Sequence, residues 1–378
     1  MLSLPPLSLY IHVPWCIKKC PYCDFNSHQA SGSLPEQEYV QALLNDFDEE
    51  AGGIQGRPLH SIFIGGGTPS LLSAHAYEQL FTGLKSKISF SKDIEITLEA
   101  NPGTYEHDRF QAYFDTGINR LSLGVQSFQD EKLQSLGRIH TAAEAQGAIA
   151  QLAASGFRNF NIDLMHGLPG QSREDALHDL KQAVALGPAH ISWYQLTIEP
   201  NTVFYSKPPR LPEDDTLWAI QEMGQGYLAS EGFAQYETSA YSQPGRQSRH
   251  NLNYWQFGDY IGIGAGAHGK LTELTTGVVY RNWKTRMPGD YLNSSKPFEA
   301  GRKYIEAEDM PIEFMMNALR LHDGVPAELF SEHTGLPISV LAEGLRLARQ
   351  KGLLEENHRL QPTPQGRLFL NNLLELFT

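Results

Sequence analysis

The chain has 378 residues, and 41% of them are hydrophobic, which is enough for a large buried core and excludes a disordered or fibrous protein. Its formal net charge of −13 argues against a broad nucleic-acid-binding surface. No apolar run reaches the roughly 18 residues of a membrane span, and no positively charged segment precedes the apolar start Met1–Leu7. We therefore expect a soluble cytoplasmic protein without a signal peptide.

The first half of the chain alternates short apolar runs with amphipathic segments. The apolar runs predict strands at Leu7–Val13, Ser61–Ile64, Ile94–Leu98, Arg120–Val125, Phe160–Met165 and His190–Leu196. Helical spacing of apolar residues predicts helices at Pro35–Glu50, Ala74–Lys85, Ala142–Ser155 and Ser172–Leu186. This alternation indicates an α/β fold, a partial (β/α)6 barrel of parallel strands. In such barrels the chemistry lies at the carboxyl ends of the strands.

All three cysteines of the chain follow the first predicted strand. Cys16, Cys20 and Cys23 have the spacing C-x3-C-x2-C. Thiolates bind iron–sulfur clusters and zinc. A four-iron cluster held by three cysteines would leave one iron open to another ligand. Structural zinc, with His12 or His28 as a fourth ligand, is the alternative.

Polar or glycine-rich turns follow the other predicted strands. The three glycines of Gly65–Ser70 would let the backbone approach a ligand closely, although a tight turn alone would also explain them. Single polar residues would surround the same end of the barrel: Glu99, Gln126, Arg138 and Asp163. The carboxylates suit ribose hydroxyls or a cationic group, and Arg138 suits a carboxylate.

The pattern changes after Pro200. A helix is predicted at Leu217–Glu231 and an extended segment at Phe233–Tyr241. The sequence His250-Asn251-Leu252-Asn253-Tyr254-Trp255 combines a histidine, which can ligate heme iron, with aromatic residues that could pack on a porphyrin. A core histidine beside core aromatic residues is the alternative interpretation. The glycines of Gly262–Gly269 lie outside any predicted βαβ unit, so we expect a tight turn there.

The last part of the chain has a different composition. Helices are predicted at Pro311–His322, Ala327–Thr334, Ile338–Gly352 and from Pro364, with a strand pair formed by Leu353–Glu356 and His358–Leu360. Helices with a small wing predict a winged-helix-like domain. Six Lys and Arg against eleven Asp and Glu in residues 305–378 argue against DNA binding. We divide the chain into a core barrel (1–237), a connecting region (238–304) and this domain (305–378).

The cysteine spacing, with the aromatic Tyr22 between the last two cysteines, resembles the radical SAM superfamily. The succession of C-x3-C-x2-C, GGGTPS, EANP, GVQSF, GRIH and DLMHGLPG resembles, within it, the oxygen-independent coproporphyrinogen III oxidase family over nearly the whole chain. The resemblance implies a 4Fe–4S cluster on Cys16, Cys20 and Cys23. It also implies one or two S-adenosylmethionine (SAM) molecules bound by Tyr10, Tyr22, Gly66, Gly67, Thr68, Glu99, Gln126, Arg138 and Asp163.

Two features separate the chain from the oxidases of that family. Phe25 stands where the oxidases have a fourth cysteine, and the chain begins almost at its first predicted strand. Phe25 together with the HNxxYW motif from His250 to Trp255 resembles the heme chaperone branch of the family. That resemblance implies that His250 binds heme.

The leading hypothesis is therefore a heme chaperone that carries a SAM-ligated 4Fe–4S cluster and delivers heme to apo-hemoproteins. Its expected partners are heme and its clients, among them membrane-bound respiratory enzymes that would bring it to the inner face of the membrane, and a second copy in a homodimer. The alternative is an enzyme, an oxygen-independent coproporphyrinogen III oxidase that performs radical SAM oxidative decarboxylation. A nucleic-acid-binding regulator is the third class, and the acidic tail argues against it.

Overall fold

The computed structural model describes residues 2–103 and 109–378. Within these residues, one sheet of 12 strands runs through most of the molecule in the order β14-β13-β12-β11-β1-β4-β5-β6-β7-β8-β10-β9. Its centre is a partial barrel of six parallel strands. They are β1 (Leu7–Val13), β4 (Leu59–Gly66), β5 (Phe90–Ala100), β6 (Arg120–Gln126), β7 (Phe160–His166) and β8 (His190–Gln195). The expected partial (β/α)6 barrel is confirmed, with every predicted strand in place.

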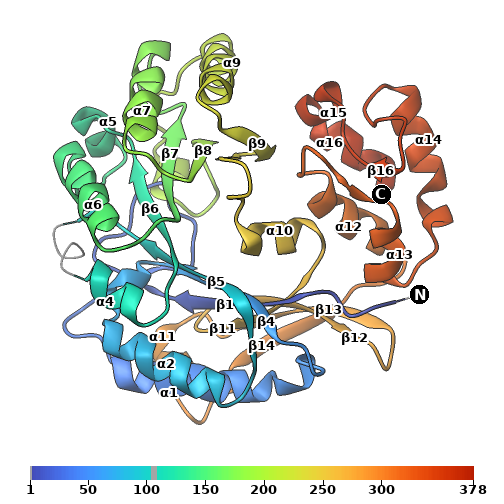
Figure 1. Ribbon diagram of the computed structural model, residues 1–378, viewed down its shortest axis with the longest axis horizontal. Helices are drawn as coiled ribbons and strands as arrows, with labels where there is room; N and C mark the ends of the chain where they lie inside the picture. The colour runs from blue at the N-terminus through green and yellow to red at the C-terminus, as the bar shows by residue number, and fades with distance from the viewer. Residues whose placement is uncertain (1, 104–108) are drawn as a thin grey trace.

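These strands are buried on both faces, with apolar residues on one face and small or polar residues among those on the other. In β1 the side chains of Leu7, Leu9, Ile11 and Val13 are almost fully buried, and so are the alternate residues Ser8 and His12. Strands covered on both faces are typical of parallel sheets. Helices pack on the outer face of the barrel, as Figure 1 shows. They are α1 (Glu36–Glu49), α2 (Ala74–Lys85), α4 (Phe110–Asp115), α5 (Asp130–Ser135), α6 (Ala142–Ala154), α7 (Arg173–Ala185) and α9 (Asp214–Ser230). The short α8 (Val203–Ser206) lies by the cysteine segment instead, where the N–H of Phe204 donates to the carbonyl of Pro21 at 3.0 Å.

Two of these helices begin at reciprocal capping boxes. The side chain of Thr141 accepts a hydrogen bond from the backbone N–H of Glu144, and the Glu144 carboxylate accepts one back from the Thr141 N–H. Ser172 and Asp175 do the same at the start of α7. Each box satisfies backbone donors that would otherwise lack partners, and it fixes where the loop after the preceding strand ends.

The sheet continues beyond the barrel on both sides. The extended segment predicted at Phe233–Tyr241 forms β9 and most of β10, whereas the strands after Trp255 were not predicted. On one side β11 (Asp259–Ile263) pairs in parallel with β1, followed by the antiparallel β12 (His268–Glu273), β13 (Val278–Lys284) and β14 (Glu299–Tyr304). On the other side lie β10 (Ala240–Ser242) and β9 (Ala234–Glu237). We expected a tight turn over Gly262–Gly269, and this prediction is correct only for the middle of that segment. Gly262 and Ile263 complete β11, and His268 and Gly269 begin β12.

Residues 305–378, which we call the small domain, lie beside the sheet and are drawn in orange and red in Figure 1. Its elements are α12 (Met310–Ala318), β15 (Val325–Pro326), α13 (Glu328–Thr334), α14 (Ala342–Gln350), β16 (Arg359–Leu360), α15 (Pro364–Leu368) and α16 (Leu370–Leu374). The predicted strand pair was wrong in its partner: β16 pairs with β15, and Leu354 makes only an isolated bridge to Pro362. Among the described residues, no helix is long and apolar enough to cross a membrane.

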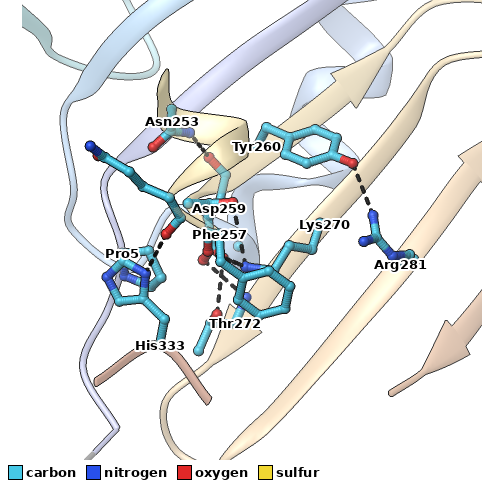
Figure 2. Close-up of polar contacts among 12 residues, drawn as sticks. Pro5, Asn253, Phe257, Asp259, Tyr260, Lys270, Thr272, Arg281 and His333 are labelled. Carbon is cyan, nitrogen blue, oxygen red and sulfur yellow. Dashed lines mark hydrogen bonds and ion pairs between the residues drawn. The ribbon is translucent and has the colours of Figure 1, made fainter. Parts of the chain in front are cut away.

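A short helix, α10 (Arg249–Trp255), connects the barrel to the rest of the sheet, and a buried ion cluster holds its end (Figure 2). The carboxylate of Asp259 accepts hydrogen bonds from Lys270 (3.0 Å), from Arg57 (2.7 Å) and from the Thr272 hydroxyl (2.9 Å). The side chain of Asn253, on α10, donates to the carbonyl of Asp259 at 2.9 Å. Burial alone would raise the pKa of Asp259, but the charges of Lys270 and Arg57 outweigh it and hold the pKa below its usual value.

The small domain contacts the same end of α10. The ring Nδ1 of His333, on α13, lies 2.9 Å from the carbonyl oxygen of Gln256, which caps the helix. The ring of Phe257 packs on that of Phe314, at 5.4 Å between centroids, and so joins the apolar core of the small domain. The helix that carries the HNxxYW motif is therefore fixed between the barrel and the small domain.

Candidate functional site

A pocket of about 340 Å³ lies at the carboxyl ends of the barrel strands. It contains most of the predicted site residues: Cys16, Cys20, Tyr22, Cys23, Gly66, Gly67, Thr68, Glu99, Gln126, Arg138 and Asp163. We call it the mouth pocket. Two predicted residues, Tyr10 and His250, do not line it.

The three cysteines occupy the loop between β1 and α1. Cys16 is buried, whereas Cys20 and Cys23 are partly exposed, and all three are free thiols. A turn closes between the last two, with the N–H of Cys23 donating to the carbonyl of Cys20 at 3.1 Å. Burial raises the pKa of the Cys16 and Cys23 thiols. Binding as thiolates therefore requires a strong cationic ligand to displace the protons.

A cluster suits these thiols better than a single metal ion. Among the described residues, no three His, Cys, Asp or Glu side chains converge on a position for one ion. Each cysteine of an iron–sulfur cluster binds a different iron, so the sulfur atoms do not need to converge. The zinc alternative named His12 or His28 as a fourth ligand. The ring nitrogens of His12 lie 2.9 Å from the Tyr10 hydroxyl and 2.9 Å from the carbonyl of Asn26, whereas His28 Nε2 is buried without a partner among the described residues.

Acidic side chains form one wall of the mouth pocket. The backbone N–H of Gly66 donates to Glu99 Oε2 at 3.2 Å, and a positive φ of 113° at Gly66 turns that N–H inward. Burial and the nearby charge of Asp163 raise the pKa of Glu99 to about 8. Asp163 accepts hydrogen bonds from Ser122 (2.8 Å) and Asn161 (2.7 Å). Two carboxyl groups held this way favour a cationic ligand, which would let both ionise.

Arg138 also lines the mouth pocket. Its Nη2 donates to the side-chain oxygen of Asn101 at 2.6 Å and to the carbonyl of Gly124 at 2.7 Å, and its Nη1 lies 3.7 Å from Cys20 Sγ. Its Nε is buried without a partner among the described residues. A buried unpaired donor is costly, so this guanidinium is suited to receive an anionic group such as a carboxylate.

The structure adds residues that the sequence interpretation missed. Asn101, Ser122, Ser192 and Tyr194 also line the mouth pocket. The Tyr194 hydroxyl donates to Gln126 at 2.8 Å, and Gln126 itself has a positive φ of 71°. Only Asn101 could have been identified from the sequence, because it follows Glu99 at the end of a predicted strand. Ser192 and Tyr194 are two residues apart on β8 and therefore share one face of the strand. The sequence does not show that this face is the one turned toward the mouth pocket.

Tyr10 lies beneath the pocket and not in it. Its hydroxyl is 2.9 Å from His12 Nδ1, and its ring stacks on Phe63 with 6.4 Å between centroids. Phe63 in turn stacks on His250, with 5.1 Å between centroids. These three rings connect the region under the mouth pocket to α10.

His250 is sealed inside the molecule, with only 1% of its surface exposed. Its Nδ1 lies 3.0 Å from the Ser61 hydroxyl, and its Nε2 lies 2.8 Å from the Tyr254 hydroxyl. Burial, with a smaller contribution from the charge of Arg120, lowers the pKa of His250 to about 3. The ring is therefore neutral at physiological pH, but neither nitrogen is free to bind a metal while α10 keeps this position.

Comparisons with known proteins agree with this architecture. Residues 10–183 match the model of the radical SAM superfamily, and residues 305–369 match that of the HemN C-terminal domain. A solved structure of coproporphyrinogen III oxidase (HemN) from Escherichia coli shares the fold, with a TM-score of 0.83 over 99% of this chain and 90% of that one, at 22% identity.

Curated relatives are far closer in sequence. Two proteins named heme chaperone HemW, from Haemophilus influenzae and Escherichia coli, are each 54% identical to this chain over its full length and 99% of theirs. A protein of the same name from Lactococcus lactis is 33% identical over 98% of this chain and 97% of its own. The chain belongs to the HemW family, built on a radical SAM fold.

Proposed function

We propose that this protein is a heme chaperone that binds heme and delivers it to apo-hemoproteins. The observation that carries the proposal is the full-length similarity, at 54% identity, to proteins named heme chaperones. The mouth pocket supports it in one respect. Phe25 lines the pocket at the position of the oxidases' fourth cysteine, and 61% of its side chain is exposed.

In this proposal the mouth pocket holds a 4Fe–4S cluster and SAM. Cys16, Cys20 and Cys23 would ligate the cluster, whose open iron would take SAM. When bound, the pair supplies an electron-transfer centre next to a cationic sulfonium. The carboxyl groups of Glu99 and Asp163 would face the positive charge of SAM, and the partnerless Nε of Arg138 would face its carboxylate.

His250 would ligate heme only after α10 has moved. Movement must break the contacts of its ring with Ser61 and Tyr254 and its stacking on Phe63. The stacked rings of Tyr10, Phe63 and His250 run from beneath the mouth pocket to α10. We propose that the state of the cluster and SAM influences through them whether His250 is released.

The proposal extends to location and partners. The chaperone would work in the cytoplasm and reach the inner face of the membrane through membrane-bound respiratory clients. A homodimer would bring two such sites together.

The competing function is an oxygen-independent coproporphyrinogen III oxidase, favoured by the fold shared with that enzyme. The test is to reconstitute the cluster without oxygen and add SAM, a reductant and coproporphyrinogen III. We expect no protoporphyrinogen beyond a single turnover, with a known oxidase as positive control. Catalytic turnover would overturn the chaperone proposal.

The role of His250 has its own test. Equilibrated hemin complexes of the wild type and of His250→Ala should differ in the position of the Soret band and in affinity. If both are unchanged in the variant, His250 does not bind heme.

A further inference from the structure

A second cleft, of about 350 Å³, lies between the barrel and the small C-terminal domain. Its lining residues come from α9 and β9 on the one hand and from the segment between the end of α12 and the start of α16 on the other. Figure 1 shows where these elements lie. Its lining includes Trp218, Leu319, Arg320, His322, Arg367 and Leu368. The cleft shares no lining residue with the mouth pocket, and its volume is within the range of small-molecule sites.

The walls of the cleft include large apolar side chains left in contact with solvent. Trp218 is 52% exposed and Leu368 is 54% exposed, on opposite sides of the cleft. Exposed apolar surface that lines a concave site indicates a ligand with apolar faces. The indole of Trp218 suits a flat ring system in particular, because aromatic rings prefer stacked or edge-on contacts.

Two arginines supply positive charge to the same cleft. Arg367 is partly buried, and among the described residues no carboxylate and no carbonyl accepts a hydrogen bond from its guanidinium. Arg320 forms an ion pair with Glu237 at 3.2 Å, and its guanidinium carbon lies 4.3 Å from the ring centroid of Trp255. Its Nε is buried without a partner among the described residues. Glu222 is the one acidic residue in the lining. The balance favours a ligand that carries carboxylates.

His322 lies among these groups. Among the described residues, its ring makes no hydrogen bond, unlike that of His250, which makes two. Burial and the nearby charge of Arg367 lower its pKa to about 4. The ring is therefore neutral at pH 7, and a neutral imidazole can ligate iron.

Together these features describe a flat apolar ligand with carboxylates at its edge and a metal at its centre. A bare metal ion does not explain the site, because no three ligating side chains converge there among the described residues. A fatty acyl chain would not use the histidine. Resting on the proposed function, we propose that the cleft receives the heme first, with His322 as ligand to the iron and Arg367 paired with a propionate.

The cleft is also connected to the HNxxYW motif. Arg320 lines the cleft, and its guanidinium stacks on Trp255, the last residue of the motif. A ligand carboxylate that drew Arg320 away from Trp255 would disturb the end of α10. Heme in the cleft could thereby loosen the helix that seals His250, so that the two histidines would act in sequence.

The test uses the full-length protein and hemin, with iron-free protoporphyrin IX as a second probe. In rapid mixing, we expect His322→Ala to weaken the first hemin complex at least tenfold and to shift its Soret band, but to leave protoporphyrin IX binding unchanged. Arg367→Gln should weaken both probes severalfold. His358→Ala, at an exposed histidine of the same domain, is the matched control.

A separate readout locates the ligand. Protoporphyrin IX in the cleft should quench Trp218 fluorescence, and Trp218→Phe should reduce the quenching of the wild type more than Trp283→Phe does. If His322→Ala misfolds, His322→Gln takes its place in the hemin measurement, and the quenching of Trp218 shows independently whether the porphyrin lies in the cleft.

The outcomes separate the two proposals. If the wild type binds hemin but neither His322 variant changes the first complex, the cleft assignment is wrong and the chaperone proposal stands. If the wild type binds no hemin, the chaperone proposal itself fails.

Discussion

The mouth pocket and the surroundings of His250 lie along the same barrel strands, but they are built in opposite ways. The mouth pocket is open, and it contains a buried donor without a partner among the described residues, Arg138 Nε, together with three cysteines that form no disulfide. His250 is enclosed, and both of its ring nitrogens are already hydrogen-bonded. The mouth pocket is ready to bind its ligands, whereas His250 must first be released. A sequence motif can therefore identify a side chain that binds a metal without showing that this side chain is accessible.

The largest effect is expected at the thiols of the mouth pocket. Cys20→Ser should remove nearly all cluster iron, since a hydroxyl is a much poorer ligand for iron–sulfur clusters than a thiolate. Iron and sulfide per chain after anaerobic reconstitution measure this. Ser33→Ala, an exposed change in the same segment between β1 and α1 but outside the mouth pocket, is the control and should keep the full iron content. Full iron in Cys20→Ser would show that the cluster is held elsewhere.

The next largest effect is expected on stability, at Asp259 in the buried ion cluster that holds the end of α10. Asp259→Asn should lower the free energy of unfolding by about 3–5 kcal/mol, because it leaves Lys270 and Arg57 buried without their counter-charge. Denaturant unfolding at pH 7 measures it. Asp93→Asn, which breaks the exposed pair with Arg249, should lower it far less, because solvent screens that pair. Equal effects of the two changes would contradict the structural role of the cluster.

The stabilisation by Asp259 also has a defined pH dependence. The folded state lowers the pKa of this carboxyl. Its contribution is therefore fully present above the unfolded value of about 3.9 and is lost as the pH falls through the folded value. Asp259→Asn should remove this part of the acid dependence.

Glu99 should give the mouth pocket a pH-dependent affinity for SAM. With a pKa of about 8, Glu99 is mostly neutral at lower pH, so binding of the cationic ligand must displace a proton. We expect the SAM affinity of the reconstituted protein to rise as the pH approaches 8 and then to level off. Glu99→Gln should weaken binding about tenfold at pH 8 and abolish the rise.

Equilibrium binding of SAM between pH 6 and pH 9 would measure both changes, with Glu131→Gln on the surface as the control. A rise in affinity that persists in Glu99→Gln would assign the titration to another group.

The smallest effect is expected at Tyr254, whose hydroxyl contacts His250 and helps to keep it buried. Tyr254→Phe removes the partner of His250 Nε2 and should lower the free energy of unfolding by about 1–2 kcal/mol. The same change should speed modification of His250 by diethyl pyrocarbonate, which peptide mapping follows. The exposed His75 should react at the same rate in both proteins. An unchanged rate at His250 would mean that Tyr254 does not help to keep it closed.

The sequence predicted the features that depend on local patterns. The six barrel strands follow from apolar runs, and the polar residues after them gather because parallel strands end at one edge. Cys16, Cys20 and Cys23 are close in sequence, so their presence in one pocket was predictable.

The features that the sequence missed depend on distant pairings. β11 joins β1 although about 250 residues separate them, which no local pattern encodes. β16 pairs with β15 and not with its neighbour in sequence. The burial of His250 depends on Ser61 and Phe63 from β4, so the motif alone could not show that the histidine is sealed.

The central claim is that the protein hands heme to another protein, and heme transfer tests it most directly. The cluster-containing protein is loaded with hemin and mixed with the apo form of a b-type hemoprotein in the presence of an excess heme scavenger. The account predicts that the acceptor gains its Soret band faster than hemin escapes to the scavenger in the absence of acceptor. Loading of the acceptor no faster than that escape would contradict the account.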